Sequence, residues 1–156
     1  MTSFELGRRY ERQVLKSLLE ELAELHAKGE TNVFARGLAV AHPYEVDISL
    51  TVDNGGFPLQ VRRIWVECRW RQDGTIKGDD VSHVVYKAQD SVRYAREIDV
   101  WHQDGLMFVS NRPFHADGIN VAKHESVACR VFDGRRLIQD IDIPDWISGP
   151  RWLRRC

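Results

Sequence analysis

Long hydrophobic runs are missing from this sequence of 156 residues. Its continuous apolar stretches span only a few residues, whereas a helix that crosses a membrane needs roughly 20. The first residues, Met-Thr-Ser-Phe-Glu, contain neither a basic region nor an apolar segment, so they do not resemble a secretory signal. These absences argue against a membrane partner and lead us to expect a cytoplasmic chain.

Cysteine and net charge are also low. The three cysteines, Cys68, Cys129 and Cys156, form no close pair and cannot all be bridged, which favours a reducing compartment. The formal net charge of −1 excludes a histone-like protein that binds nucleic acid through overall basicity. It does not exclude an enzyme that places carboxylates at its centre and basic residues at its rim.

Several catalytic motifs are absent as well. The sequence has no glycine-rich phosphate loop and no Gly-x-Ser-x-Gly, and its six histidines show no zinc-like spacing. ATP hydrolysis, serine hydrolase chemistry and a zinc site are therefore set aside. What is present is an ordinary globular composition, 43% apolar and 29% charged, in a length that suits one domain.

Hydrophobic periodicity predicts one α/β domain with the order α-β-β-β-α-β-α-β. The predicted helices span Ser3–Leu25, Asp79 or Asp80 to Glu97, and about Pro113 to His124. The predicted strands span Asn32–Val40, Tyr44–Val52, Val61–Trp70, Leu106–Val109 and Val127–Phe132. Residues 1–140 form this domain, and residues 141–156 are predicted to be an irregular tail that includes Trp146 and Trp152.

Two carboxylates stand out on the central strands. Alternation places Val46, Ile48, Leu50 and Val52 on one face of the first strand and Asp47 on the other. In an antiparallel hairpin centred near residue 57, facing residues have numbers that add up to about 114, as Asp47 and Glu67 do. Their Cβ atoms are therefore expected to be about 5 Å apart on the polar face.

Like charges in this position need a cation between them. One interpretation is an ion pair with Arg69, which lies on the same face as Glu67. The other is a divalent metal, because hard cations bind carboxylate oxygens. Glu11 lies at one end of an otherwise apolar helical stripe, and its pattern alone favours a position in water.

These residues resemble the PD-(D/E)XK nuclease superfamily, and most closely its Mrr-like restriction endonuclease branch. The resemblance rests on a helix bearing Glu11, on Val46-Asp47-Ile48 in one strand and on Trp65-Val66-Glu67-Cys68-Arg69-Trp70 in the next. It continues through the segments 104–111 and 129–134 and covers roughly residues 7–137. The fold that it implies is a restriction-endonuclease-like core, with a mixed central sheet flanked by helices.

The resemblance also implies a site. Asp47 and Glu67 would be metal ligands, together with the backbone carbonyl of Cys68, and Glu11 would be an accessory carboxylate. The cofactor would be Mg²⁺ or Mn²⁺, and the reaction would be hydrolysis of a DNA phosphodiester. Such a reaction needs a metal to polarise the phosphate and a positive charge to stabilise the transition state.

The sequence departs from the family pattern at two positions. Val46 stands where a proline is usual, and Arg69 stands at the lysine position. Arginine keeps the positive charge but does not act as a base. Three outcomes stay open: Arg69 serves electrostatically, Lys87 or Lys77 replaces the missing lysine, or cleavage is lost while binding remains.

The hypothesis from the sequence is a metal-dependent DNA endonuclease with Asp47, Glu67, Arg69 and Glu11 at its site. Its alternative is a non-catalytic protein of the same fold that binds nucleic acid or a protein partner. The expected partner is DNA, with a protein partner or a second copy of the chain in a homodimer as further options. The candidate contacts with nucleic acid are Arg36, Lys77, Lys87, Gln89 and Arg93.

Overall fold

The computed structural model describes residues 1–53 and 61–142. Its helices are α1 (Ser3–Glu21), α2 (Gly78–Glu97) and α3 (Ala116–Glu125), and a 3-10 helix spans Ala23–Leu25. Its strands are β1 (Lys28–Ala35), β2 (Tyr44–Asp53), β3 (Val61–Arg69), β4 (Gly105–Ser110), β5 (Ala128–Phe132) and β6 (Leu137–Asp142). The predicted connection at 54–60 and most of the predicted tail lie outside the described residues.

The six strands of the described part form one open mixed sheet in the order β1-β2-β3-β4-β5-β6. The pairs β1–β2, β2–β3 and β5–β6 are antiparallel. The pairs β3–β4 and β4–β5 are parallel, and α2 and α3 form the crossovers that parallel neighbours require. The α/β class predicted from the sequence is therefore confirmed.

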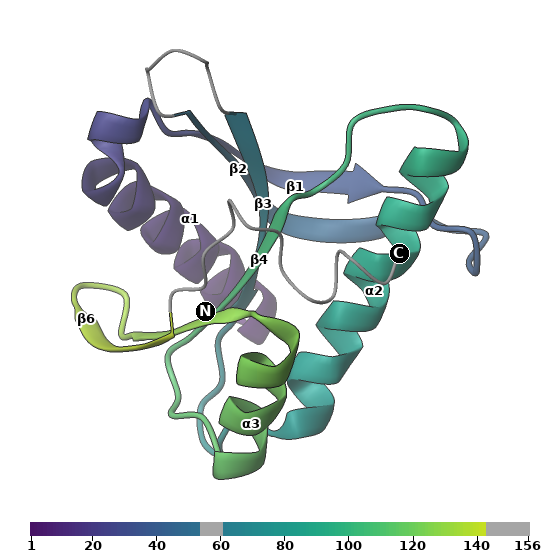
Figure 1. Ribbon diagram of the computed structural model, residues 1–156. Coiled ribbons are helices and arrows are strands. Elements are labelled where there is room, and N and C mark those ends of the chain that lie inside the picture. Colours follow the sequence, from purple (N-terminus) through teal and green to yellow (C-terminus); the bar gives the residue numbers. More distant parts are fainter. Residues whose placement is uncertain (54–60, 143–156) are drawn as a thin grey trace.

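Helices cover both faces of the sheet (Figure 1). On one face, α1 packs through Tyr10, Val14 and Leu18 on a cluster that includes side chains of β2, β3 and β4. On the other face, α2 and α3 pack on a cluster that includes Trp65 and Phe108. Among the described residues, no helix combines the length and the apolar character that crossing a bilayer requires.

The first helix begins as its sequence predicts and ends earlier. The Glu5 N–H donates to Thr2 Oγ1 (3.1 Å), and the Thr2 N–H donates to Glu5 Oε2 (2.8 Å), and these two bonds form a capping box in front of Ser3, the predicted first residue. The helix ends at Glu21 rather than at Leu25, because the chain tightens into a 3-10 turn and reaches a left-handed conformation at His26 (φ 50°).

The first strand is shifted toward the N-terminus from its predicted position at 32–40. It starts at Lys28 and ends at Ala35, before Gly37. The buried carboxylate of Asp90 in α2 accepts hydrogen bonds from the backbone N–H groups of Leu38 and Ala39 (both 3.1 Å). These backbone donors are thus taken by a helix side chain instead of a strand neighbour.

A sixth strand, β6, was not predicted, and the predicted domain boundary at residue 140 falls inside it. The prediction took Asp133-Gly134 as the end of the last strand, whereas these residues form the turn between β5 and β6. Asp133 Oδ1 accepts the N–H groups of Arg135 (2.8 Å) and Arg136 (2.9 Å), and Gly134 has a φ of 102°. The predicted order α-β-β-β-α-β-α-β therefore lacks one strand.

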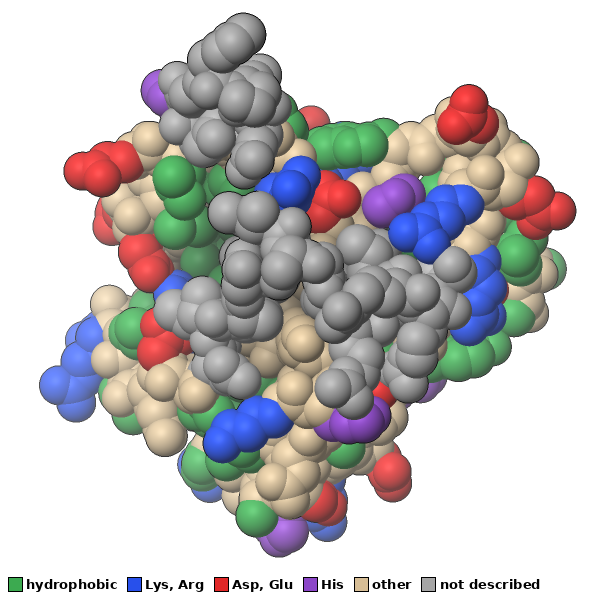
Figure 2. Space-filling model, viewed as in Figure 1, with side chains coloured by type: hydrophobic (Ala, Val, Ile, Leu, Met, Phe, Trp, Pro, Cys, Tyr) green, Lys and Arg blue, Asp and Glu red, His purple; other side chains and the backbone are tan. Residues whose placement is uncertain are grey.

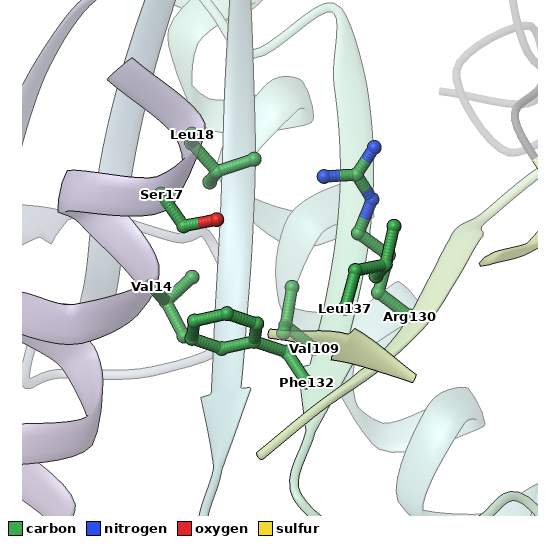
Figure 3. A pocket seen from close by; sticks show the side chains of 7 residues that line it. All are labelled: Val14, Ser17, Leu18, Val109, Arg130, Phe132 and Leu137. Carbon is green, nitrogen blue, oxygen red and sulfur yellow. The ribbon is translucent and has the colours of Figure 1, made fainter. Parts of the chain in front are cut away.

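A small cleft lies between α1 and the strands β4, β5 and β6 (Figure 3). Its wall is mostly apolar, but Arg130 of β5 also lines it. The Arg130 side chain is only 7% exposed and is paired with Glu21 (2.5 Å) and Asp140 (2.8 Å). Arg130 thereby connects the end of α1 to both C-terminal strands of the described region.

Candidate active site

The two central carboxylates lie at adjoining positions of the β2–β3 ladder. The register of the two strands runs from Asp53↔Val61 to Ile48↔Val66, and the residue numbers of each pair add up to the predicted 114. Asp47 and Glu67 are the next residues of the two strands. The predicted register is therefore confirmed as far as Ile48↔Val66, the pair next to the two acids, which are 20 residues apart in the sequence.

Asp47 interrupts the regular ladder at this point. Its Oδ2 accepts the backbone N–H of Cys68 at 2.8 Å, so a side chain replaces the usual backbone acceptor. Val46 packs with the cluster under α2, whereas Ile48, Leu50 and Val52 pack with the cluster under α1. The prediction that Val46 shares the face of Ile48 is therefore wrong.

The environment of Asp47 disfavours its charge. Burial is the main cause and the carboxylate of Glu67 the next, and together they raise the pKa of Asp47 to about 8. The hydrogen bond from Cys68 opposes this shift, while the charges of Glu11 and Glu45 add to it. A buried group of acids with this property is a natural position for a cation.

Glu11 of α1 adds a third carboxylate next to Asp47 and Glu67. The sequence pattern favoured a position in water, but the residue is 8% exposed, so that expectation is wrong. Burial raises the pKa of Glu11, while Arg8 one turn earlier lowers it through an ion pair of 3.1 Å. The helix is held in place next to it by Tyr10, whose hydroxyl donates to the Phe132 carbonyl at 2.8 Å.

Two further residues of this group were not predicted from the sequence. Glu45 lies two residues before Asp47, and its Oε1 is 2.7 Å from Arg8 Nη1. Arg8 also donates to Asn32 of β1. Glu45 could have been found in the sequence, because it alternates with Asp47 in one strand. Arg8 could not, because its role depends on how α1 packs. Arg8, Glu11, Glu45 and Asp47 line an open pocket of about 500 Å³ at the first turns of α1.

Glu67 is surrounded by basic groups on the α2 side of the sheet. Its side chain is 7% exposed, and its Oε2 lies 3.4 Å from Arg69 Nη2 and 3.8 Å from Lys87 Nζ. Arg69 is shared, because its Nη1 lies 3.2 Å from Asp80 Oδ1 at the start of α2. The structure thus places both Arg69 and Lys87 against the carboxylate that the sequence singled out.

The donor set suits a hard divalent cation, although its present arrangement does not enclose one. The carboxylates of Asp47 and Glu67 and the carbonyl of Cys68 are the oxygen donors that Mg²⁺ prefers. Within residues 1–53 and 61–142, however, no three His, Cys, Asp or Glu side chains are grouped closely enough to hold a metal. Burial raises the pKa of the Cys68 thiol, and that side chain packs toward the α1 cluster as predicted.

The other candidate contacts with nucleic acid are spread along α2 and β1. Lys77 is exposed at the start of α2, Gln89 is half-buried in its middle and Arg93 is exposed further along. Arg36 is exposed just after β1. Figure 2 shows Lys and Arg side chains next to each other over α2, on the right of the view. Among these predicted contacts, Lys87 lies against Glu67 of the acid site.

Comparisons with known proteins support the fold alone. No protein-family model and no curated protein matches this chain. One solved structure, titled "Crystal Structure of Protein of Unknown Function AF1548", is similar, with a TM-score of 0.56 and 16% sequence identity. The match covers 78% of this chain and 56% of that one, so this chain spans just over half of the neighbour's length.

Proposed function

We propose that this chain is a metal-dependent DNA endonuclease with a restriction-endonuclease-like core. The observation that carries the proposal is the group of Glu11, Asp47 and Glu67, in which burial and mutual repulsion raise the pKa of Asp47 to about 8. Leaving acids buried close together costs stability unless a cation binds. Perturbed acids of this kind are characteristic of functional sites.

The arrangement of elements also supports the proposal. A helix bearing an acid, a three-stranded antiparallel unit with one acid on each of its last two strands, and a crossover helix follow each other in the order that the resemblance implies. The acids lie at the point where β2 and β3 stop pairing regularly. A scissile phosphate bound at the end of this ladder would therefore contact the acids.

A bound Mg²⁺ or Mn²⁺ would polarise the phosphate and lower the pKa of the attacking water. Asp47, Glu67 and the Cys68 carbonyl would hold this cation, and Glu11 would orient water from the α1 side. The contact of Arg8 with Glu11 and Glu45 keeps these outer carboxylates in place.

The positive charge at the site comes from two residues, so either of them can fill the role of the missing lysine. Arg69 and Lys87 both contact Glu67 Oε2. Lys87 is the stronger candidate for the missing lysine, because Arg69 also forms an ion pair with Asp80. Lys77 is the weaker one, because it is exposed at the start of α2. We therefore assign the transition-state charge to Lys87 and the positioning of Glu67 to Arg69.

A cleavage assay tests the proposal. Purified protein is incubated with Mg²⁺ or Mn²⁺ and with duplex, nicked or single-stranded DNA. We expect cleavage that EDTA abolishes and that Asp47→Ala and Glu67→Ala reduce at least about 100-fold. The exposed Glu24 provides a matched control, since Glu24→Ala removes a carboxylate far from the site. Cleavage that is the same in Asp47→Ala as in Glu24→Ala would contradict the assignment.

A non-catalytic protein of the same fold is the second candidate. Its support is the ion-paired state of Glu67, in which Arg69 and Lys87 supply the positive charge that a metal would otherwise provide. Such a protein would bind DNA or a protein partner without cutting. It would show no cleavage in any of the three DNA forms, and Mn²⁺ would not change its thermal stability.

A further inference from the structure

A second cavity, of about 190 Å³, lies apart from the acid group. It is bounded by the end of β1, the C-terminal half of α2 and the connection from α2 to β4, which lie together at the upper right of Figure 1. The connection contributes Trp101 and Gln103, and β3 contributes Arg63.

The wall of this cavity is firmly held. The Asp104 N–H donates to the Arg63 carbonyl at 2.7 Å, and the Arg63 N–H donates to Asp104 Oδ2 at 3.0 Å. The connection is thereby fastened to β3 directly after the residues that line the cavity. A wall that is already in place loses little entropy when a ligand binds.

Two buried polar atoms at this wall have no hydrogen-bond partner among the described residues. Gln103 is 6% exposed, and its Oε1 is unpaired. The Nε of Arg63 is also buried and unpaired. Buried polar groups are nearly always hydrogen-bonded, so this pair indicates a ligand with polar groups of its own.

The aromatic part of the cavity is partly free. The Arg63 guanidinium lies 4.1 Å from the centroid of the Trp101 ring, while Trp101 remains 46% exposed. Arg36, exposed at the end of β1, adds a second positive charge to the lining. A flat aromatic surface, an amide and an arginine are the groups that proteins use to hold an unstacked nucleotide.

We infer that this cavity binds one unpaired nucleotide of a DNA strand. The base stacks on Trp101, the Gln103 amide hydrogen-bonds to the base edge, and Arg36 pairs with a phosphate. This inference rests on the proposed function, because it specifies the substrate of that nuclease as DNA with an unpaired base. A fully paired duplex would have to give up stacking and pairing to fill the same cavity.

Binding without metal tests the inference separately from cleavage. Fluorescence anisotropy in EDTA compares a short duplex that carries one extra unpaired base with the same duplex fully paired. We expect tighter binding of the first, and Trp101→Ala should weaken it by about 10- to 100-fold. Gln103→Leu, which fills the same space without the amide, should also reduce the preference. Ile98→Ala is the control, because Ile98 is similarly exposed but does not line the cavity.

Each outcome has a clear meaning. Equal affinity for the two duplexes, or the same loss in Trp101→Ala as in Ile98→Ala, would overturn the inference. Binding of a free deoxynucleoside monophosphate without any preference between duplexes would also overturn it, since the ligand would then be a free nucleotide. A preference for the unpaired base without cleavage in Mg²⁺ would overturn the nuclease proposal and leave this inference in place. Cleavage in Mg²⁺ without a preference for the unpaired base would overturn this inference and leave the nuclease proposal in place.

Discussion

Asp47 accepts a hydrogen bond from the Cys68 N–H, and the side-chain amide of an asparagine could accept the same bond. A substitution of Asp47 by asparagine can therefore test the charge of this residue while the hydrogen bond is kept. Asp47→Asn retains an acceptor oxygen at the same position and removes one of the clustered carboxylates. We expect it to abolish cleavage and, in EDTA, to raise the free energy of unfolding by about 1 kcal/mol or more. That corresponds to an increase of about 2–4 °C in the melting temperature.

Thermal unfolding in EDTA at neutral pH measures this effect. Asp79→Asn is a suitable control, because it makes the same Asp-to-Asn replacement at an exposed acid of α2. A lower melting temperature for Asp47→Asn than for the control would show that the site does not carry the repulsion that its burial and neighbours imply.

Lys87 and Arg69 differ in what a substitution should do. If Lys87 supplies the transition-state charge, Lys87→Gln should lower the cleavage rate by about 100- to 1000-fold with little change in stability. Arg69→Lys retains a charge next to Glu67 and should cost less than about tenfold. Single-turnover cleavage rates test both, with the exposed Lys16→Gln as control. A larger loss in Arg69→Lys than in Lys87→Gln would reverse the assignment.

At this scale the sequence predicted the pair Asp47 and Glu67 because pairing in an antiparallel hairpin follows from residue numbers alone. It did not predict the burial of Glu11, because that depends on how the first turns of α1 pack against β2. The sequence also did not decide whether Lys87 contacts Glu67, because a helical pattern does not say which strand residue each side chain contacts.

Among the elements, α1, β5 and β6 are connected through the guanidinium of Arg130. Arg130 is buried, but its partners Glu21 and Asp140 are 42% and 28% exposed, so water partly solvates them once Arg130 is removed and the loss costs about 1–3 kcal/mol. Arg130→Met should therefore lower the free energy of unfolding by an amount in this range. Urea denaturation measures it, and Arg12→Met on the exposed side of α1 is the control. A loss no larger than that of the control would show that the elements are held by apolar packing alone.

Glu21 should make this connection pH-dependent. Its hydrogen bond with Arg130 lowers the pKa of Glu21 below its usual value. A lowered carboxyl pKa contributes stability above the unfolded-state value of about 4.3, and this contribution is lost as the pH falls through the folded-state pKa. Glu21→Gln should be less stable than the parent at pH 7, and the two should converge in acid.

Denaturation midpoints across pH 3–7 measure the difference between these two proteins. Glu24→Gln is the matched control, because Glu24 is an exposed acid only three residues away. A constant difference between Glu21→Gln and the parent at all pH values would show that the interaction with Arg130 does not depend on the charge of Glu21.

The elements themselves were predicted where their patterns are local. The buried run in β4 and the capped start of α1 depend on a few adjacent residues and were correct. β1 and β6 were not, because Asp90 and Asp133 redirect the chain through hydrogen bonds to backbone N–H groups. In β6 the apolar residues Leu137 and Ile138 are 44% and 51% exposed, so no buried stripe marks the strand.

For the molecule as a whole, a bound cation should be linked to stability. A ligand that binds only the native state stabilises it, by about 2.7 kcal/mol at a concentration of 100 times its Kd. For a domain of this size, the melting temperature should then rise by about 5–10 °C. We expect this increase with Mn²⁺ in the parent protein and its absence in Asp47→Ala, while Glu24→Ala should respond as the parent does. If Mn²⁺ leaves the parent unchanged, Arg69 and Lys87 are the permanent partners of Glu67, and the non-catalytic alternative is correct.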